Sequence, residues 1–116
     1  MKIQTESLQK KYQCPVEATM DVIGGKWKII IIHHLISKTQ RFSELKRLIP
    51  QITQRMLTSQ LRELEANGVV HREVYPQVPP KVEYSLTKFG QTLESVLLVM
   101  HDWGDDFIKK SDCQYK

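Results

Sequence analysis

The chain has 116 residues, of which 41% are hydrophobic and 26% charged, the length and balance of one soluble globular domain with a single core. No apolar run approaches the roughly 20 residues of a membrane span, and the polar N-terminal segment lacks the apolar stretch of a secretory signal. We therefore expect one domain over residues 1–116, a cytoplasmic location and no membrane partner. The formal charge of +4 is uneven, because residues 38–62 hold six Lys and Arg against one acid. This asymmetry indicates a polyanionic partner for the middle of the chain rather than a merely solvated basic face.

Two short helices are predicted before residue 38. The first lies in CPVEATMDVIGG, where Pro15 suits the first helical turn and the glycine pair ends the helix. The second lies in KWKIIIIHHLIS, whose β-branched run would also suit a strand. The length of this segment and the helical spacing of Trp27, Ile31 and Leu35 favour a helix. A very short strand is expected around residues 40–42.

A helix-turn-helix is predicted over residues 43–67. Its first helix, in SELKRLIP, is expected to use Ser43 as N-cap and to end at Pro50. After a short turn, the second helix is expected to begin after Thr53 as N-cap and to end at the Asn67-Gly68 pair. Two helices joined by so short a turn form this motif.

The second helix of the motif has two distinct faces. An apolar stripe comprises Met56, Leu57, Leu61 and Leu64. The opposite face comprises Arg55, Thr58, Ser59 and Arg62, flanked by Gln54 and Gln60. This polar face has no acid before Glu63, whereas an ordinary solvated face pairs acids with bases. Hydroxyl, amide and guanidinium groups can read base edges and phosphates, so the pattern indicates a DNA recognition helix.

A β-hairpin is predicted over residues 69–86. Two β-rich runs, residues 69–75 and 81–86, flank the proline-rich turn 76–80. A helix-turn-helix followed directly by a hairpin is the element order of a winged helix. The expected fold is therefore mainly α with a small β-hairpin (α+β).

One long helix is predicted over residues 88–110, with Thr87 as its N-cap. Its apolar side chains step by four and three, which is a heptad-like spacing: Phe89, Leu93, Val96, Met100, Trp103 and Phe107. Residues 97–99 widen this stripe beyond what one small domain can cover. We expect the stripe to bury against a second copy of the chain, and the alternative is that it folds back onto its own core.

Four segments together resemble the HxlR-type transcriptional regulators, a bacterial winged-helix family related to the MarR regulators. In order, they are CPVEATMDVIGGKWKIIIIHHL, RFSELKRLIPQITQRMLTSQLRELEANGVV, YPQVPPKVEYSLTKFG and HDWG, and they span residues 14–103. The resemblance implies a winged helix-turn-helix with N- and C-terminal dimerisation helices. It also implies a homodimer that binds double-stranded DNA near promoters, with the second helix of the motif in the major groove.

The DNA contacts can be assigned from the expected helix orientation. The N-terminal half of a recognition helix enters the groove most deeply, so the residues expected at bases and nearby phosphates are Gln54, Arg55, Thr58 and Ser59. The residues expected at the phosphate backbone are Ser43, Lys46, Arg47 and Arg62. Lys81 of the hairpin is expected at a flanking groove or phosphate. Arg72 either assists Lys81 or pairs with Glu83.

Two cysteines, Cys14 and Cys113, lie near opposite ends of the chain and lack metal-ligand spacing. Cys14 precedes Pro15 at a helix N-terminus, where the helix dipole and the nearby Lys10-Lys11 pair favour the thiolate. The resemblance implies a candidate sensor of oxidants or electrophiles at Cys14, since several regulators of this family carry a cysteine in the same setting. An unreactive residue at the helix start is the alternative. Cys113 is either a resolving partner across a dimer or an exposed thiol.

The sequence offers no enzyme signature, so we expect no catalytic residues and no cofactor. His33 and His34 are adjacent and point about 100° apart on a helix, which disfavours a shared metal ion. A protein-interaction module is the rival class, but it would expose an aromatic or aliphatic anchor on the polar face. A ligand-responsive regulator without thiol sensing is the other alternative, and the small-molecule effector is unknown.

Overall fold

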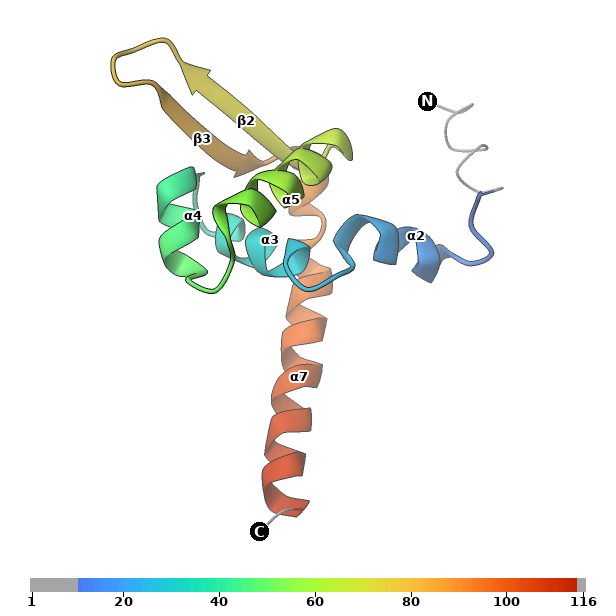
Figure 1. Cartoon of the computed structure of the whole chain (residues 1–116). Coiled ribbons are helices and arrows are strands. Elements are labelled where there is room, and N and C mark those ends of the chain that lie inside the picture. Colours follow the sequence, from blue (N-terminus) through green and yellow to red (C-terminus); the bar gives the residue numbers. More distant parts are fainter. Residues whose placement is uncertain (1–10, 115–116) are drawn as a thin grey trace.

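The computed structural model describes residues 11–114 as a winged helix-turn-helix with a projecting C-terminal helix (Figure 1). Its elements in chain order are α2 (Pro15–Ile23), α3 (Lys28–Ile36), β1 (Gln40–Arg41), α4 (Phe42–Leu48), α5 (Gln54–Ala66), β2 (Val70–Tyr75), β3 (Lys81–Leu86), α6 (Lys88–Gln91) and α7 (Glu94–Gln114). The predicted fold class is confirmed. Among the helices of the described segment, none combines the length and apolar character needed to cross a membrane.

The core lies among α3, α4, α5 and the start of β2. Its buried hydrophobic residues are Ile23, Ile31, Ile32, Leu35, Leu45, Ile49, Ile52, Leu57, Leu61, Leu64, Val69 and Val70. Helix α5 contributes Leu57, Leu61 and Leu64, which recur at helical spacing as predicted. Met56 was wrongly assigned to this stripe, because its side chain is 40% exposed. A stripe centred on Leu57, Leu61 and Leu64 leaves the residue before Leu57 at the edge of the buried face.

The two helices of the motif begin in different ways. Thr53 is the N-cap of α5 as predicted, and its Oγ1 accepts a hydrogen bond from the Met56 backbone N–H at 3.1 Å. The prediction that Ser43 caps α4 is wrong, because α4 begins at Phe42 with Arg41 as N-cap. Arg41 is held extended by pairing with Glu83 across the sheet, and its backbone N–H donates to Glu44 Oε1 at 2.7 Å. Strand pairing therefore places the N-cap and the start of α4 two residues earlier than predicted.

The sheet has three antiparallel strands in the order β1-β3-β2. The short strand expected near residue 40 joins the sheet by placing Gln40 opposite Tyr84. The hairpin pairs Val70 with Leu86 and Tyr75 with Lys81, so the wing is close to its predicted bounds. Helix α5 ends at Asn67-Gly68 as predicted, with Gly68 at φ +75°, the left-handed conformation that glycine favours.

The segment predicted as one helix over 88–110 is instead two helices. Thr87 caps α6 through a hydrogen bond from the Gly90 backbone N–H, at 2.9 Å. Gly90 packs so tightly on Val69 that an added Cβ would fall on the Val69 carbonyl oxygen. With α6 held against the sheet, the chain turns at Thr92 before α7 leaves the domain.

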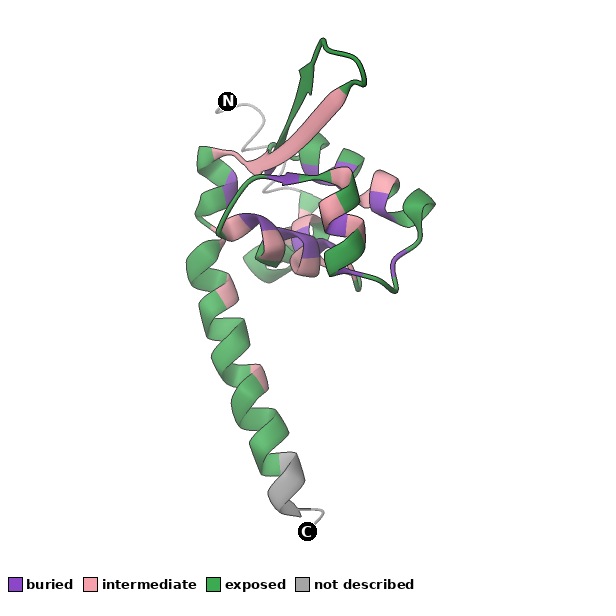
Figure 2. Cartoon of the chain, turned by 90° about the vertical axis from the view of Figure 1, so that its left-hand side faces the viewer, coloured by how far each residue is buried: buried purple, intermediate pink, exposed green. Residues whose placement is uncertain are grey.

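Helix α7 projects away from the body of the protein, and most of its length is exposed (Figure 2). Only the first turn of α7 packs against the core, through Leu97. Leu93, just before the helix, packs against the core as well. The predicted stripe therefore does not fold back onto the core over most of the helix.

Candidate nucleic-acid interface

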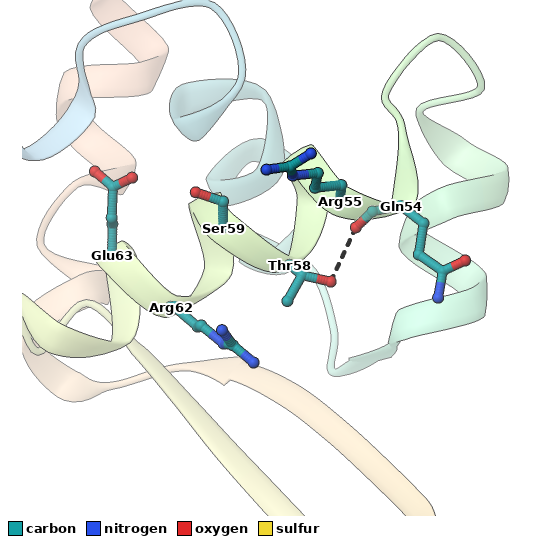
Figure 3. Close-up of a pocket in the computed structure, with 6 residues that line it drawn as sticks. All are labelled: Gln54, Arg55, Thr58, Ser59, Arg62 and Glu63. Atoms are coloured by element: carbon teal, nitrogen blue, oxygen red, sulfur yellow. Dashed lines mark hydrogen bonds between the residues drawn. The ribbon is translucent and has the colours of Figure 1, made fainter.

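The exposed side of α5 carries a shallow depression of about 660 Å³, which we call the α5 depression. Its lining residues are Gln54, Arg55, Thr58, Ser59, Arg62 and Glu63 (Figure 3). They form two rows at four-residue spacing along the helix. Gln54, Thr58 and Arg62 point towards the side of the wing, and Arg55, Ser59 and Glu63 point towards the opposite side. All four residues predicted to contact bases therefore share one surface with Arg62.

The cations of the α5 depression are available to a ligand. Arg55 and Arg62 are exposed, and within residues 11–110 neither side chain forms an ion pair. Thr58 is partly committed, because its Oγ1 donates to the Gln54 carbonyl oxygen at 2.9 Å. Thr58 can therefore still accept a hydrogen bond at its hydroxyl oxygen and make an apolar contact through its methyl group. Unpaired guanidinium groups beside hydroxyls and an amide suit a polyanion with readable edges.

Helix α4 adds basic groups beside α5. Lys46 and Arg47 lie in its last turn, and neither forms an ion pair in the described part of the chain. Ser43 is exposed near the start of the same helix. The hydrogen bond from the Arg41 backbone N–H lowers the pKa of the Glu44 carboxyl, and the cations Lys38, Arg41 and Arg47 act in the same direction.

The wing cation is held against its own hairpin. Lys81 Nζ lies 3.4 Å from Glu83 Oε2 and 4.8 Å from the centroid of the Tyr75 ring. The Glu83 carboxylate, through a hydrogen bond and its charge, raises the pKa of Tyr75. Lys81 is the first residue of β3, directly after the loop at the tip of the wing, where it was expected. Its charge is shared with Glu83.

Of the two alternatives for Arg72, the pairing with Glu83 is wrong. Arg72 Nε lies 3.6 Å from Glu65 Oε1 of α5, and Glu83 faces Glu73 across the hairpin. Since side chains alternate between the two faces of a strand, the register directs Arg72 towards α5 instead. Arg72 therefore links the wing to the end of α5.

Sequence reasoning missed one ion pair at the α5 depression. Lys28 Nζ of α3 lies 2.8 Å from Glu63 Oε1 of α5, and Lys28 is only 8% exposed. The available signal was its spacing, since Lys28 precedes Ile31, Ile32 and Leu35 at three, four and seven residues on the buried face of α3.

Cys14 is an exposed free thiol at the N-cap of α2. Glu17 Oε1 accepts hydrogen bonds from the backbone N–H groups of Cys14, at 3.2 Å, and Gln13, at 3.1 Å. Lys11, expected to favour the thiolate, lies 3.8 Å from Asp21 Oδ2 and shares its charge with that carboxylate. The expectations for Lys10 and for the Cys113 side chain lie outside the described residues.

A second exposed surface is apolar and lies along α7. Its residues, which we call the α7 stripe, are Val96, Val99, Met100, Trp103 and Phe107. Trp103 is 68% exposed, and its ring stacks on that of Phe107 with centroids 5.5 Å apart. Val16 and Met20 of α2 are also exposed. So much exposed apolar area on one helix is typical of a protein interface.

Comparison with known proteins identifies related chains over most of the length. The profile of a family described as HxlR-like helix-turn-helix matches residues 22–112. An uncharacterized HTH-type transcriptional regulator, YdeP of Bacillus subtilis (strain 168), is 65% identical over 99 residues, covering 85% of this chain and 77% of YdeP.

Two solved structures of the redox regulator HypR also resemble the chain. The reduced form is 61% identical, with a TM-score of 0.82 over 86% of this chain and 99% of the other. The oxidized form is 67% identical, with a TM-score of 0.77 over 80% of this chain and 96% of the other. The family match over residues 22–112 spans the helix-turn-helix, the wing and most of α7.

Proposed function

Because the chain belongs to the HxlR-like helix-turn-helix family, and is thus a helix-turn-helix transcriptional regulator, we propose that it binds a pseudo-palindromic DNA operator as a homodimer. Residues 1–116 form one winged-helix DNA-binding domain in this proposal. The helix-turn-helix comprises residues 43–67, the wing 69–86 and the C-terminal dimerisation segment 88–110.

The α5 depression is the observation that carries this proposal. It presents two guanidinium groups that form no ion pair within residues 11–110, two hydroxyls and one amide on the outward side of a helix. A helix of this kind fits the major groove, where such groups discriminate base pairs. A protein-interaction module would require an apolar anchor here, and the α5 depression has none among its lining residues.

The contacts assigned to DNA follow from this orientation. Residues proposed for bases and nearby phosphates are Gln54, Arg55, Thr58 and Ser59. Residues proposed for the phosphate backbone are Ser43, Lys46, Arg47, Arg62 and Lys81. Lys81 must share its charge between a phosphate and Glu83, so we assign it the weakest of these contacts.

Homodimerisation is supported by the α7 stripe. The exposed aromatic pair Trp103 and Phe107 requires a partner surface, and a second copy of the same helix offers a self-complementary one. Two-fold symmetry would then direct the two α5 helices into major grooves about 10 bp apart or a multiple of that distance.

The proposal is tested by titrating the protein against pooled genomic DNA fragments at two salt concentrations. Enrichment of a palindromic site is expected, with an affinity that falls steeply as salt rises because phosphate contacts release counterions. Binding no tighter than to random fragments would contradict operator recognition. Capture of a protein partner in place of DNA would favour the interaction-module reading.

We also propose that Cys14 makes the regulator responsive to oxidants or electrophiles. Support comes from the exposed thiol at the start of α2 and from the likeness to a redox regulator. A hydroperoxide would transfer one oxygen atom to the Cys14 sulfur, giving a sulfenic acid and releasing the alcohol or water. The alternative is a regulator without thiol sensing that responds to a ligand, for which a hollow of about 380 Å³ between α3 and α7 is available.

Replacing Cys14 with serine should leave operator affinity within about 0.5 kcal/mol of the unmodified protein, since the thiol is a surface group. The change of affinity on adding peroxide should disappear in this variant. Both can be measured by fluorescence anisotropy with a labelled operator, and Cys113→Ser shows whether the second thiol takes part: the response is lost if Cys113 is a resolving partner and kept if it is not. A peroxide response that persists in Cys14→Ser would remove Cys14 from the mechanism.

A further inference from the structure

Glu63 is an anomaly on a surface proposed to meet a polyanion. It is the one acid among the six residues that line the α5 depression, in the same row as Arg55 and Ser59 (Figure 3). Its side chain is 52% exposed, so little protein would separate its carboxylate from the phosphates of bound DNA. An unpaired carboxylate at this position would repel the ligand that the neighbouring arginines attract.

Lys28 neutralises this carboxylate from the protein interior. Its Nζ lies 2.8 Å from Glu63 Oε1, and its side chain is 10% exposed. Among the ion pairs of the described residues, this one buries its cation most deeply. Lys28 reaches Glu63 from α3, 35 residues earlier in the chain.

Stability alone does not account for a lysine at this position. Lys28 precedes Ile31, Ile32 and Leu35 on the buried face of α3, where an aliphatic side chain would pack without a charge to desolvate. Replacement of a buried ion pair by apolar residues is often neutral or stabilising. An uncharged side chain at this position is therefore compatible with the fold.

We propose that Lys28 is a positioning residue for DNA binding, which holds and neutralises the Glu63 carboxylate so that the α5 depression presents a net positive surface to phosphates. This inference rests on the proposed function. Lys28 itself does not touch DNA. It acts through Glu63, and the loss of its ammonium exposes a negative charge beside Arg55 and Arg62.

The test begins with Lys28→Met, which keeps an unbranched stem and removes the charge. Affinities for the enriched operator and for an unrelated duplex of equal length are measured by fluorescence anisotropy at two salt concentrations. We expect about ten-fold weaker binding to both duplexes, because phosphate electrostatics do not depend on sequence. The melting temperature should stay the same or rise.

Two further variants separate this effect from a general loss of charge. Lys28→Met combined with Glu63→Gln should return to within about two-fold of the unmodified affinity, because no carboxylate is left unpaired. Lys26→Met removes the same charge from an exposed lysine whose Nζ lies over the Trp27 ring at 4.7 Å. It should weaken binding less than Lys28→Met does.

Several outcomes would overturn the inference. A double variant as weak as Lys28→Met would show that the loss does not pass through Glu63. Glu63→Gln alone keeps an amide oxygen that can accept a hydrogen bond from Lys28 Nζ, and this variant should bind at least as tightly as the unmodified protein. Weaker binding by that variant would mean that Glu63 itself contacts DNA, and this arm remains decisive if Lys28→Met does not fold.

The inference and the proposed function fail in distinguishable ways. If the unmodified protein binds DNA and Lys28→Met binds equally well, only the inference about Lys28 is wrong. If the unmodified protein binds no DNA at either salt concentration, both are wrong.

Discussion

Replacing Arg55 with alanine should weaken binding to the cognate operator by about 1–3 kcal/mol while changing the affinity for unrelated DNA far less. Arg55 lies in the first turn of α5, the part of a recognition helix that reaches base edges, and its guanidinium is exposed and forms no ion pair in the described residues. A bidentate contact to guanine O6 and N7 would supply this discrimination. The measurement is an anisotropy titration of both duplexes at one fixed salt concentration.

Arg62→Ala is the matched control for Arg55→Ala. Arg62 lies two turns further along the same surface and is assigned to the phosphate backbone, so its loss should weaken both duplexes alike and reduce the salt slope by about one. If Arg55→Ala also weakens both duplexes equally, Arg55 contacts only the backbone and the assignment of base contacts must move to its neighbours.

The second large effect is expected for Trp103→Glu, which should convert the proposed homodimer into a monomer. The substitution introduces a charge at the exposed centre of the α7 stripe, where burial against a second copy would leave the carboxylate unpaired at a cost of several kcal/mol. Light scattering should give 13.6 kDa for the variant and twice that mass for the unmodified protein. Operator affinity should fall more than about 100-fold, because each half-site is then bound independently.

Lys109→Glu provides the matched control on the same helix. Lys109 is exposed, lies away from the α7 stripe around the helix and pairs with Asp105 at 3.0 Å, an exposed contact worth little to stability. It adds a negative charge to α7 and should leave the dimer intact. An unmodified protein that is itself monomeric at micromolar concentration would contradict the dimer proposal, and a dimeric Trp103→Glu variant would show that the interface lies elsewhere.

Much of the architecture could be predicted because the relevant signals are local. The Thr53 cap acts on a backbone N–H three residues later, and Gly68 ends α5 through its own conformation. The proline-rich turn lies between two β-rich runs, which gave the hairpin to within one residue at its start. The same reasoning identified the polar face of α5, since the orientation of side chains around a helix follows from spacing alone.

Apart from Met56, whose exposure follows from its place at the edge of the apolar stripe, the wrong or missing expectations involve partners on other elements of the fold. The start of α4 depends on the pairing of Arg41 with Glu83, and the break before α7 depends on the packing of Gly90 against Val69. A pairing of Arg72 with Glu83 on the adjacent strand is one of two alternatives that the sequence leaves open, but the register of the hairpin directs Arg72 to Glu65. No pattern within a few residues contains this information.

The sequence by itself determined which segments are helices and strands, which face of α5 is polar and where the basic residues concentrate, because these properties arise from neighbours within about one helical turn. Only the tertiary structure decided which of those charges remain free. Arg55 and Arg62 are left exposed, whereas Glu63 is neutralised by Lys28 from another helix and Lys81 is shared with Glu83. Charge pairing acts over a few ångströms of space rather than along the chain, so the electrostatics of the candidate DNA surface could be read only once α3, α5 and the wing were placed together.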